Sequence, residues 1–258
     1  MTSAWLSTIN DDNHAEIARR LWWDQGVTEP HPDPAITARA ITMRGPWGPV
    51  YGPIDLNVES GGVTVLVCPP GSGRTALLMT LAGRMRPASG ELTVLGRNRV
   101  RDIFAHAALA GVDELDTVAE SVTVRDLITE QLRWDAPWYR LVRRADAADL
   151  ADVCARVFGD VPLPPLTEYV EELSELDGLL LRIALANTGR PPLLVVGNLE
   201  QVTSDRHRDV LVTRLVELGR TQTVVTASVN GVPDHPVRHL EVPNASRTEL
   251  AGVQNGGE

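Results

Sequence analysis

A short apolar segment followed by a glycine-rich loop is the feature that most limits how this chain can fold. Residues 63–67 read Val-Thr-Val-Leu-Val, which is typical of a fully buried strand, and Cys68-Pro-Pro-Gly-Ser-Gly-Arg-Thr75 follows directly. A helical pattern continues from Thr75 to Met85. A strand that enters a helix through such a loop predicts an α/β domain with this strand inside a sheet.

The loop aligns with the phosphate-binding pattern G-x-x-x-x-G-K-[ST], known as Walker A. Backbone N–H groups of such a loop, together with the positive end of the following helix, can hold a polyphosphate. Cys68 replaces the first glycine and Arg74 the lysine, so an ordinary glycine-rich turn is the alternative. We expect Arg74 to contact the phosphates of a nucleotide and Thr75 to supply a hydroxyl ligand to Mg²⁺. The other residues expected to bind nucleotide are Pro70, Gly71, Ser72, Gly73 and Ala76.

Charge and composition exclude several classes of function. All 24 basic residues are arginine, so Arg74 fits either a functional replacement of lysine or a general bias of the sequence. The net charge of −10 argues against a broad nucleic-acid-binding surface, and we expect no nucleic acid partner. No apolar run reaches the roughly 18 residues that cross a bilayer, and the N-terminus does not resemble a secretory leader. With only two cysteines, these features favour the cytoplasm.

Strand and helix patterns alternate along the rest of the chain. Residues 1–35 are predicted to be an extension with a short helix, and residues 243–258 a disordered polar tail. Between them, strands are predicted over 36–43, 54–58, 63–67, 91–95, 104–109, 193–196, 223–226 and 237–242. Helical patterns dominate 121–189 and 205–218. This alternation favours an α/β fold with a parallel or mixed sheet.

Further segments resemble the ATP-binding cassette (ABC) proteins. Leu81-Ala-Gly-Arg-Met-Arg-Pro-Ala-Ser-Gly-Glu-Leu-Thr-Val-Leu-Gly96 is similar to the stretch that follows Walker A in that family. Ser121-Val-Thr-Val-Arg-Asp-Leu127 resembles the opening of the family's helical subdomain. Leu173-Ser174 and Arg182-Ile-Ala-Leu-Ala186 resemble its signature motif, and Leu193 to Val196 lies where its Walker B strand is expected.

The resemblance covers about residues 36–242 and implies a P-loop NTPase core, with a parallel sheet and an antiparallel β subdomain, plus an ABC-type helical subdomain. The core would comprise 36–118 and 190–242, and the helical subdomain 119–189. Such domains form homo- or heterodimers in which ATP lies between one Walker A and the partner's signature motif, here Leu173 and Ser174. The family also implies a transmembrane permease partner and a peripheral position on the cytoplasmic face of the cell membrane.

Positions that the family uses for hydrolysis differ in this chain. Gly197 and Asn198 stand where the Mg²⁺-associated aspartate and the catalytic glutamate are expected, so no catalytic residue is assigned. Glu200 would serve as the base only after a two-residue shift in register. The Q-loop glutamine and the switch histidine are also replaced, by Asp113 with Glu114, and by Ala227, Ser228 and Val229.

Aromatic residues mark two candidate contacts. Trp47 is the first candidate for stacking on adenine and Tyr51 the second, with coverage of a sheet edge as the alternative. Trp134, Trp138 and Tyr139 fall where the family docks its permease, and the alternative is a small satellite core beneath the Pro137 turn.

Together these features predict a degenerate ABC subunit of a membrane transporter or related membrane complex, with ATP and Mg²⁺ as cofactors and weak or absent hydrolysis. Glu175 and Asp177 would repel a partner's phosphate near Ser174, which weakens the signature motif. One alternative is a non-enzymatic pseudo-ATPase with a regulatory or scaffolding role. Another is ordinary transporter ATPase activity through Glu200.

Overall fold

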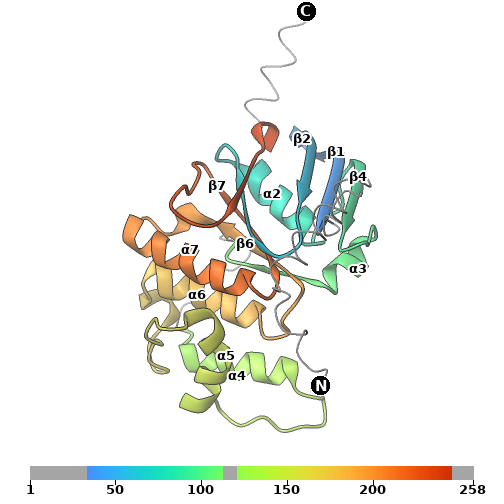
Figure 1. Cartoon of the computed structure of the whole chain (residues 1–258). Helices are drawn as coiled ribbons and strands as arrows, with labels where there is room; N and C mark the ends of the chain where they lie inside the picture. Colours follow the sequence, from blue (N-terminus) through green and yellow to red (C-terminus); the bar gives the residue numbers. More distant parts are fainter. Residues whose placement is uncertain (1–33, 113–120, 246–258) are drawn as a thin grey trace, which may run out of the picture. The chain divides into compact units, whose positions relative to one another are not determined.

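A computed structural model describes residues 34–112 and 121–245, and their strands form two sheets (Figure 1). The smaller sheet is antiparallel, with strand order β2 (Gly48–Val58), β1 (Ile36–Gly45), β4 (Ser89–Val94). The larger sheet is parallel, with strand order β5 (Ala107–Ala110), β6 (Leu193–Asn198), β7 (Thr223–Ser228), β3 (Gly62–Val67), β8 (Arg238–Glu241).

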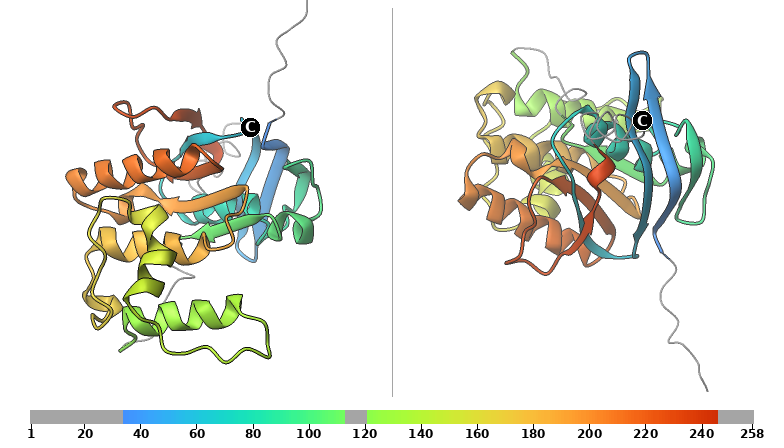
Figure 2. Two further views of the ribbon diagram at one scale, coloured as in Figure 1. Left: turned by 60° about the horizontal axis from the view of Figure 1, so that its bottom comes forward. Right: turned by 90° about the horizontal axis from the view of Figure 1, so that it is seen from above.

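Helix α2 (Ser72–Leu81) packs between the two sheets (Figure 2). Its buried residues Leu77 and Leu81 share one core with Ile36 and Tyr51 of the antiparallel sheet and with Val195 of the parallel sheet. Strands β3, β6 and β7 are almost wholly buried, as expected for a parallel sheet covered on both faces. This burial explains why their sequences are continuous apolar runs rather than alternating ones.

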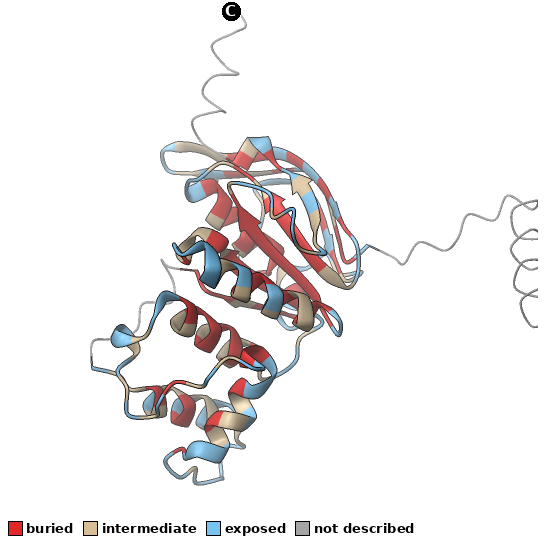
Figure 3. Ribbon diagram, turned by 60° about the vertical axis from the view of Figure 1, so that its left-hand side comes forward, coloured by how far each residue is buried: buried red, intermediate tan, exposed pale blue. Residues whose placement is uncertain are grey.

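A second core joins the other face of the parallel sheet to four helices, and Figure 3 shows their buried sides facing inward. They are α4 (Val124–Asp135), α5 (Ala147–Phe158), α6 (Glu175–Ala186) and α7 (Asp205–Gly219). Capping boxes begin α4 at Thr123 and α5 at Asp146. Short 3₁₀ turns lie at η1 (Val170–Glu172), η2 (Leu199–Gln201) and η3 (Pro243–Ala245). Within the described ranges, no helix is both long enough and apolar enough to cross a membrane.

The structure confirms the predicted fold class, with parallel and antiparallel sheets beside a helical part, but corrects two local predictions. Residues 104–109 are not one strand: helix α3 (Val100–Phe104) ends at Phe104, and β5 begins at Ala107. Phe104 is half exposed and stacks under the Arg84 guanidinium, 3.7 Å from the ring centre, so its apolar side chain covers the surface.

The second correction concerns the start of the predicted polar tail. Pro243–Ala245 form η3 instead of disordered chain, because Ala245 is fully buried and the Asn244 side-chain amide donates to the Pro53 carbonyl at 3.1 Å. The remainder of the predicted tail lies outside the described residues. The helix predicted within residues 1–35 does so too, because the described part of that segment begins only after Asp33.

Candidate functional site

The carboxyl ends of β3, β6 and β7 meet at one edge of the parallel sheet. Val67 lies opposite Ser228, and Asn198 lies opposite Ala227, so the three strand ends are direct neighbours. Open α/β sheets bind ligands at this edge, because loops and helix N-termini converge there. The predicted Walker A loop, the predicted Walker B residues and the residues after β7 therefore form one candidate site.

The loop after β3 presents the N-terminus of α2 without a side-chain cap. Gly71 is the N-cap residue and has a φ of 142°, a conformation that favours glycine. No side chain caps this end in the described structure, and its first turn holds no acidic residue. Pro70 and Ser72 are exposed and Thr75 is half-buried. Uncapped backbone N–H groups at a helix N-terminus are suited to an anion such as phosphate.

Gly73 lies where two other backbone segments come close to α2. A Cβ atom added at this position would overlap the carbonyl oxygens of Val50, in β2, and of Ala245, in η3. The close packing of these two segments therefore requires glycine at position 73. Its neighbours Arg74 and Ala76 are also buried, so the first turn of α2 is held firmly from one side.

Arg74 is bound by an internal carboxylate. Its guanidinium Nη1 lies 3.1 Å from Oε2 of Glu200, in η2. The Arg74 side chain is 9% exposed and that of Glu200 33%, so the pair is shielded on the arginine side. The other oxygen of Glu200 accepts hydrogen bonds from the Ser228 hydroxyl at 2.8 Å and the Val229 N–H at 2.7 Å. One carboxylate thus connects α2 to the end of β7.

The end of β6 has no room for the carboxylate that the family pattern places there. A Cβ atom added at Gly197 would overlap the Gly111 carbonyl oxygen. The Gln201 amide donates to this same carbonyl at 2.5 Å and to the Asn198 carbonyl at 3.1 Å. The Thr226 hydroxyl donates to the Gly197 carbonyl at 2.6 Å. This packing makes glycine at 197 a requirement of the fold.

The aromatic candidates for adenine differ sharply in exposure. Trp47 lies in the turn between β1 and β2 and is 82% exposed. Tyr51 is fully buried, and its hydroxyl donates to the Thr80 hydroxyl at 2.8 Å. Burial raises the pKa of Tyr51 and outweighs the Thr80 hydrogen bond, which acts in the opposite direction. Tyr51 is therefore a core residue, and Trp47 is left as the stacking candidate.

The signature-like residues begin helix α6. Leu173 is half-buried, and Ser174 is the N-cap residue, whose hydroxyl accepts from the Asp177 N–H at 3.1 Å and donates to the Asp177 carboxylate at 2.7 Å. Glu175 accepts from the backbone N–H and the hydroxyl of Thr203, both at 2.8 Å. These two hydrogen bonds hold the pKa of Glu175 below its usual range. Both acidic residues are thus already bonded within the chain.

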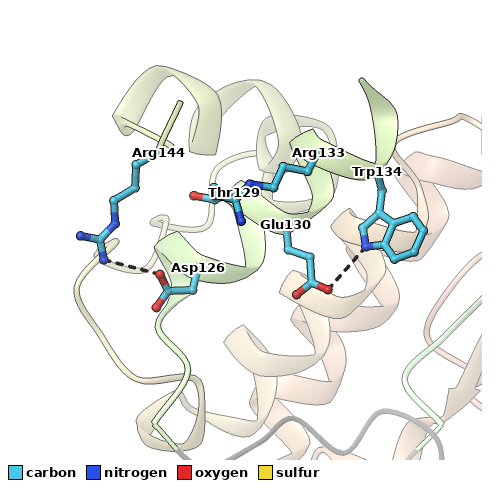
Figure 4. A pocket seen from close by; sticks show the side chains of 6 residues that line it. All are labelled: Asp126, Thr129, Glu130, Arg133, Trp134 and Arg144. Atoms are coloured by element: carbon cyan, nitrogen blue, oxygen red, sulfur yellow. Dashed lines mark hydrogen bonds and ion pairs between the residues drawn. The ribbon is translucent and has the colours of Figure 1, made fainter. Parts of the chain in front are cut away.

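The aromatic cluster of the helical part is exposed, so the predicted satellite core beneath Pro137 is wrong. Trp134, Trp138 and Tyr139 are 78%, 96% and 75% exposed. Trp134 lies in the last turn of α4, and the segment after α4, which carries Trp138 and Tyr139, lacks regular structure. An open hollow of about 570 Å³ lies at α4 and is lined by Trp134, Thr129 and the charged side chains of Asp126, Glu130, Arg133 and Arg144 (Figure 4).

Three further points concern the predicted Mg²⁺ contact, the residues at the Q-loop position and the thiol of Cys68. No group of three His, Cys, Asp or Glu side chains that could hold a metal occurs within the described ranges, and the predicted Mg²⁺ contact rests on Thr75 alone. Asp113 and Glu114 lie outside the described residues. Cys68 is buried, and this burial raises its pKa to about 11 despite the nearby Arg74.

Sequence reasoning missed the roles of Gln201 and Ser228 and the pairing of Glu200 with Arg74. One signal was available for that pair. A buried arginine needs an anionic partner, and with the carboxylates missing at positions 197 and 198, Glu200 is the nearest acidic residue along that segment. No comparable signal marks Gln201, because its target is a backbone carbonyl 90 residues away.

Comparison with known proteins points to one family. A family model described as ABC transporter matches residues 51–196. The chain is 28% identical over 166 residues to the cytochrome c biogenesis ATP-binding export protein CcmA of Pseudomonas putida (strain GB-1), covering 62% of this chain and 72% of CcmA. It is 35% identical over 97 residues to the probable multidrug ABC transporter ATP-binding protein YbhF of Escherichia coli (strain K12), covering 36% of this chain and 17% of YbhF.

The chain therefore spans less than a fifth of YbhF, and it spans 44% of CcmA from Cupriavidus pinatubonensis. Among solved structures, cbiO1 from Clostridium perfringens, part of the ABC transporter complex cbiONQ, superposes with a TM-score of 0.62 at 15% identity, covering 86% of this chain and 92% of cbiO1. That likeness shows a shared P-loop NTPase fold. With the family match over more than half of its residues, the chain belongs to the ABC transporter family.

Proposed function

We propose that this chain is the nucleotide-binding subunit of a membrane transport complex, and that it holds ATP with weak or absent hydrolysis. The expected nucleotide contacts are the loop Pro70 to Ala76 and Trp47, with Thr75 toward Mg²⁺. The uncapped N-terminus of α2 supports phosphate binding, because its backbone donors have no acidic neighbour in the first turn.

The main observation in support of weak or absent hydrolysis is the packing of Gly197 against the Gly111 carbonyl. A carboxylate beside Mg²⁺ and a second one that polarises water are what such a reaction needs from the protein. The packing at Gly197 leaves no room for the carboxylate beside Mg²⁺. At the position of the second carboxylate, Asn198 has no group that accepts a proton readily. Glu200 is a poor substitute, because both its oxygens already accept hydrogen bonds within the chain.

The partners follow from family membership and from the exposed aromatic cluster. We expect a transmembrane permease subunit to cover Trp134, Trp138 and Tyr139, since exposed aromatic side chains of this size are enriched at protein interfaces. We further expect a homo- or heterodimer with another ABC domain to complete the complex, and we expect the chain to lie on the cytoplasmic face of the cell membrane. YbhF and CcmA are named for multidrug transport and for export in cytochrome c biogenesis, and no substrate is transferred from them.

The test is calorimetric titration of the full chain with Mg-ATP, together with a phosphate-release assay. We expect saturable binding that weakens at least about tenfold in Arg74→Ala, because hydrogen bonds to charged groups contribute about 1.5–3 kcal/mol. Arg86→Ala is the matched control, since Arg86 is exposed and follows the C-terminal end of α2, away from the phosphate loop in sequence. Phosphate release should stay at the buffer rate. Turnover that Glu200→Gln abolishes would instead establish the ordinary ATPase alternative.

A second candidate is the non-enzymatic pseudo-ATPase with a regulatory or scaffolding role. The observation that favours it is the Arg74–Glu200 ion pair, which satisfies the arginine without any nucleotide. This candidate predicts no binding at millimolar ATP in the wild-type chain or in any variant of the loop. The same titration therefore separates the two candidates.

A further inference from the structure

Glu200 makes an unusual set of contacts for an acidic residue at a phosphate site. Its carboxylate lies between the guanidinium of Arg74 on one side and the Ser228 hydroxyl and Val229 N–H on the other. It thereby accepts from three donors, one charged and two neutral, on two different elements. A carboxylate and a phosphate oxygen offer a guanidinium the same kind of acceptor.

We propose that Glu200 is an internal ligand of Arg74 that competes with the phosphates of a nucleotide and so sets the nucleotide affinity of this site. The proposal rests on the proposed binding of ATP at the same loop. When phosphate takes the guanidinium, the Glu200 carboxylate loses its cationic partner and is left close to another anion. Both effects oppose binding, because an uncompensated, partly buried charge is costly and like charges repel.

The same contacts connect nucleotide binding to the end of β7. Ser228 donates its hydroxyl to Glu200, and its carbonyl accepts from the N–H of Cys68, where the phosphate loop begins, at 2.9 Å. Val229 is held to Glu200 through its backbone. If phosphate displaces Glu200 from Arg74, the position of this carboxylate changes, and Ser228 and Val229 are the groups that respond. Glu200 is thus a positioning residue that links the loop to the segment after β7.

The test is titration of the full-length wild type and Glu200→Gln with Mg-ATP. The glutamine keeps the shape and can still accept from Ser228 and Val229, but it removes the charge that competes for Arg74. We expect Glu200→Gln to bind Mg-ATP at least about tenfold more tightly than the wild type. Glu241→Gln is the matched control, because Glu241 is close enough to raise the pKa of Cys68 but forms no ion pair with Arg74 in the described structure. It should change the affinity by no more than about twofold.

Two outcomes are separated by this design. Equal affinity of the wild type and Glu200→Gln, or weaker binding by Glu200→Gln, would overturn the competition while leaving ATP binding intact. No binding by any variant at millimolar ATP would overturn both the proposed function and the competition. As a second readout, Mg-ATP should increase hydrogen exchange at the Val229 amide of the wild type but not of Glu200→Gln saturated with ATP. Unchanged exchange in the wild type would overturn the link to β7.

Discussion

Two helix N-termini in this protein have the opposite chemistry. Helix α2 begins at Gly71 with no side-chain cap and no acidic residue in its first turn. Helix α6 begins at Ser174 with a hydroxyl cap and with Glu175 and Asp177 in its first turn. Both ends have a positive helix dipole, but only the first has backbone donors without an anion from the chain itself.

In the proposed dimer, the α6 end of one subunit would face nucleotide bound at the partner's phosphate loop. Here the α6 end is already neutralised by its own carboxylates, whereas the α2 end is open. If the chain binds nucleotide as proposed, this difference favours its phosphate loop over its signature surface as the part that it contributes to the dimer. A partner cassette with an intact signature motif would therefore complete the site on α2 better than a second copy of this chain.

The largest effect is expected when the first turn of α2 is given an acidic residue like those in the first turn of α6. Ser72→Glu places a carboxylate in the exposed first turn of α2. We expect Mg-ATP affinity to fall at least about tenfold, since placing like charges together costs several kcal/mol. The fold should be retained or slightly stabilised, because an acidic residue near a helix N-terminus contributes about 0.3–1 kcal/mol. Calorimetry and thermal melting measure both effects, with Ser72→Gln as the neutral control; unchanged affinity in Ser72→Glu would contradict phosphate binding at α2.

A smaller effect, on the free energy of unfolding, is expected from removing the side-chain cap of α6. Ser174→Ala deletes the hydroxyl that accepts from the Asp177 N–H, and loss of such a cap costs about 1 kcal/mol of the free energy of unfolding. Ser72→Ala is the matched control at α2, where Gly71 rather than the serine is the N-cap residue, and should stay within about 0.5 kcal/mol. Urea unfolding of the two variants and the wild type measures these changes in the free energy of unfolding. Equal destabilisation would show that the α2 end depends on its serine as well.

The smallest effect is local and depends on pH. Glu175 has a pKa held below its ordinary value of 4.5 by the N–H and hydroxyl of Thr203. Its stabilising contribution is therefore complete above that ordinary pKa and is lost as the pH falls through the lower pKa of the folded state. We expect the Thr203 amide to lose protection from hydrogen exchange under acidic conditions, beyond the intrinsic pH dependence of exchange. Glu175→Gln should remove this pH dependence, and protection that persists in acid would rule out the Glu175 contact as its cause.

Much of the fold follows from local sequence patterns. The apolar run at 63–67 becomes β3, the glycine-rich loop leads into α2, and the pattern at 205–218 becomes α7. Local patterns fail where burial is decided by distant contacts. Phe104 is apolar but ends a surface helix beneath Arg84, and Ala245 in the predicted tail is buried against the phosphate loop.

The candidate site was predictable in its location but not in its internal contacts. A resemblance to a motif identifies positions 74 and 197, yet the partner of Arg74 is 126 residues away in sequence. Likewise, Gly197 looks like a lost aspartate in the sequence, whereas the structure shows a glycine enforced by the Gly111 carbonyl. Such requirements arise from backbone segments that approach each other only in the folded chain.

The burial of both cysteines has a practical consequence for labelling. The sequence contains only Cys68 and Cys154, and burial raises their pKa values to about 11 and about 12. Thiol reagents attack the thiolate, which is scarce at both positions near neutral pH. A single cysteine introduced at exposed Trp138 would therefore accept a fluorophore or spin label selectively, without prior removal of the native thiols.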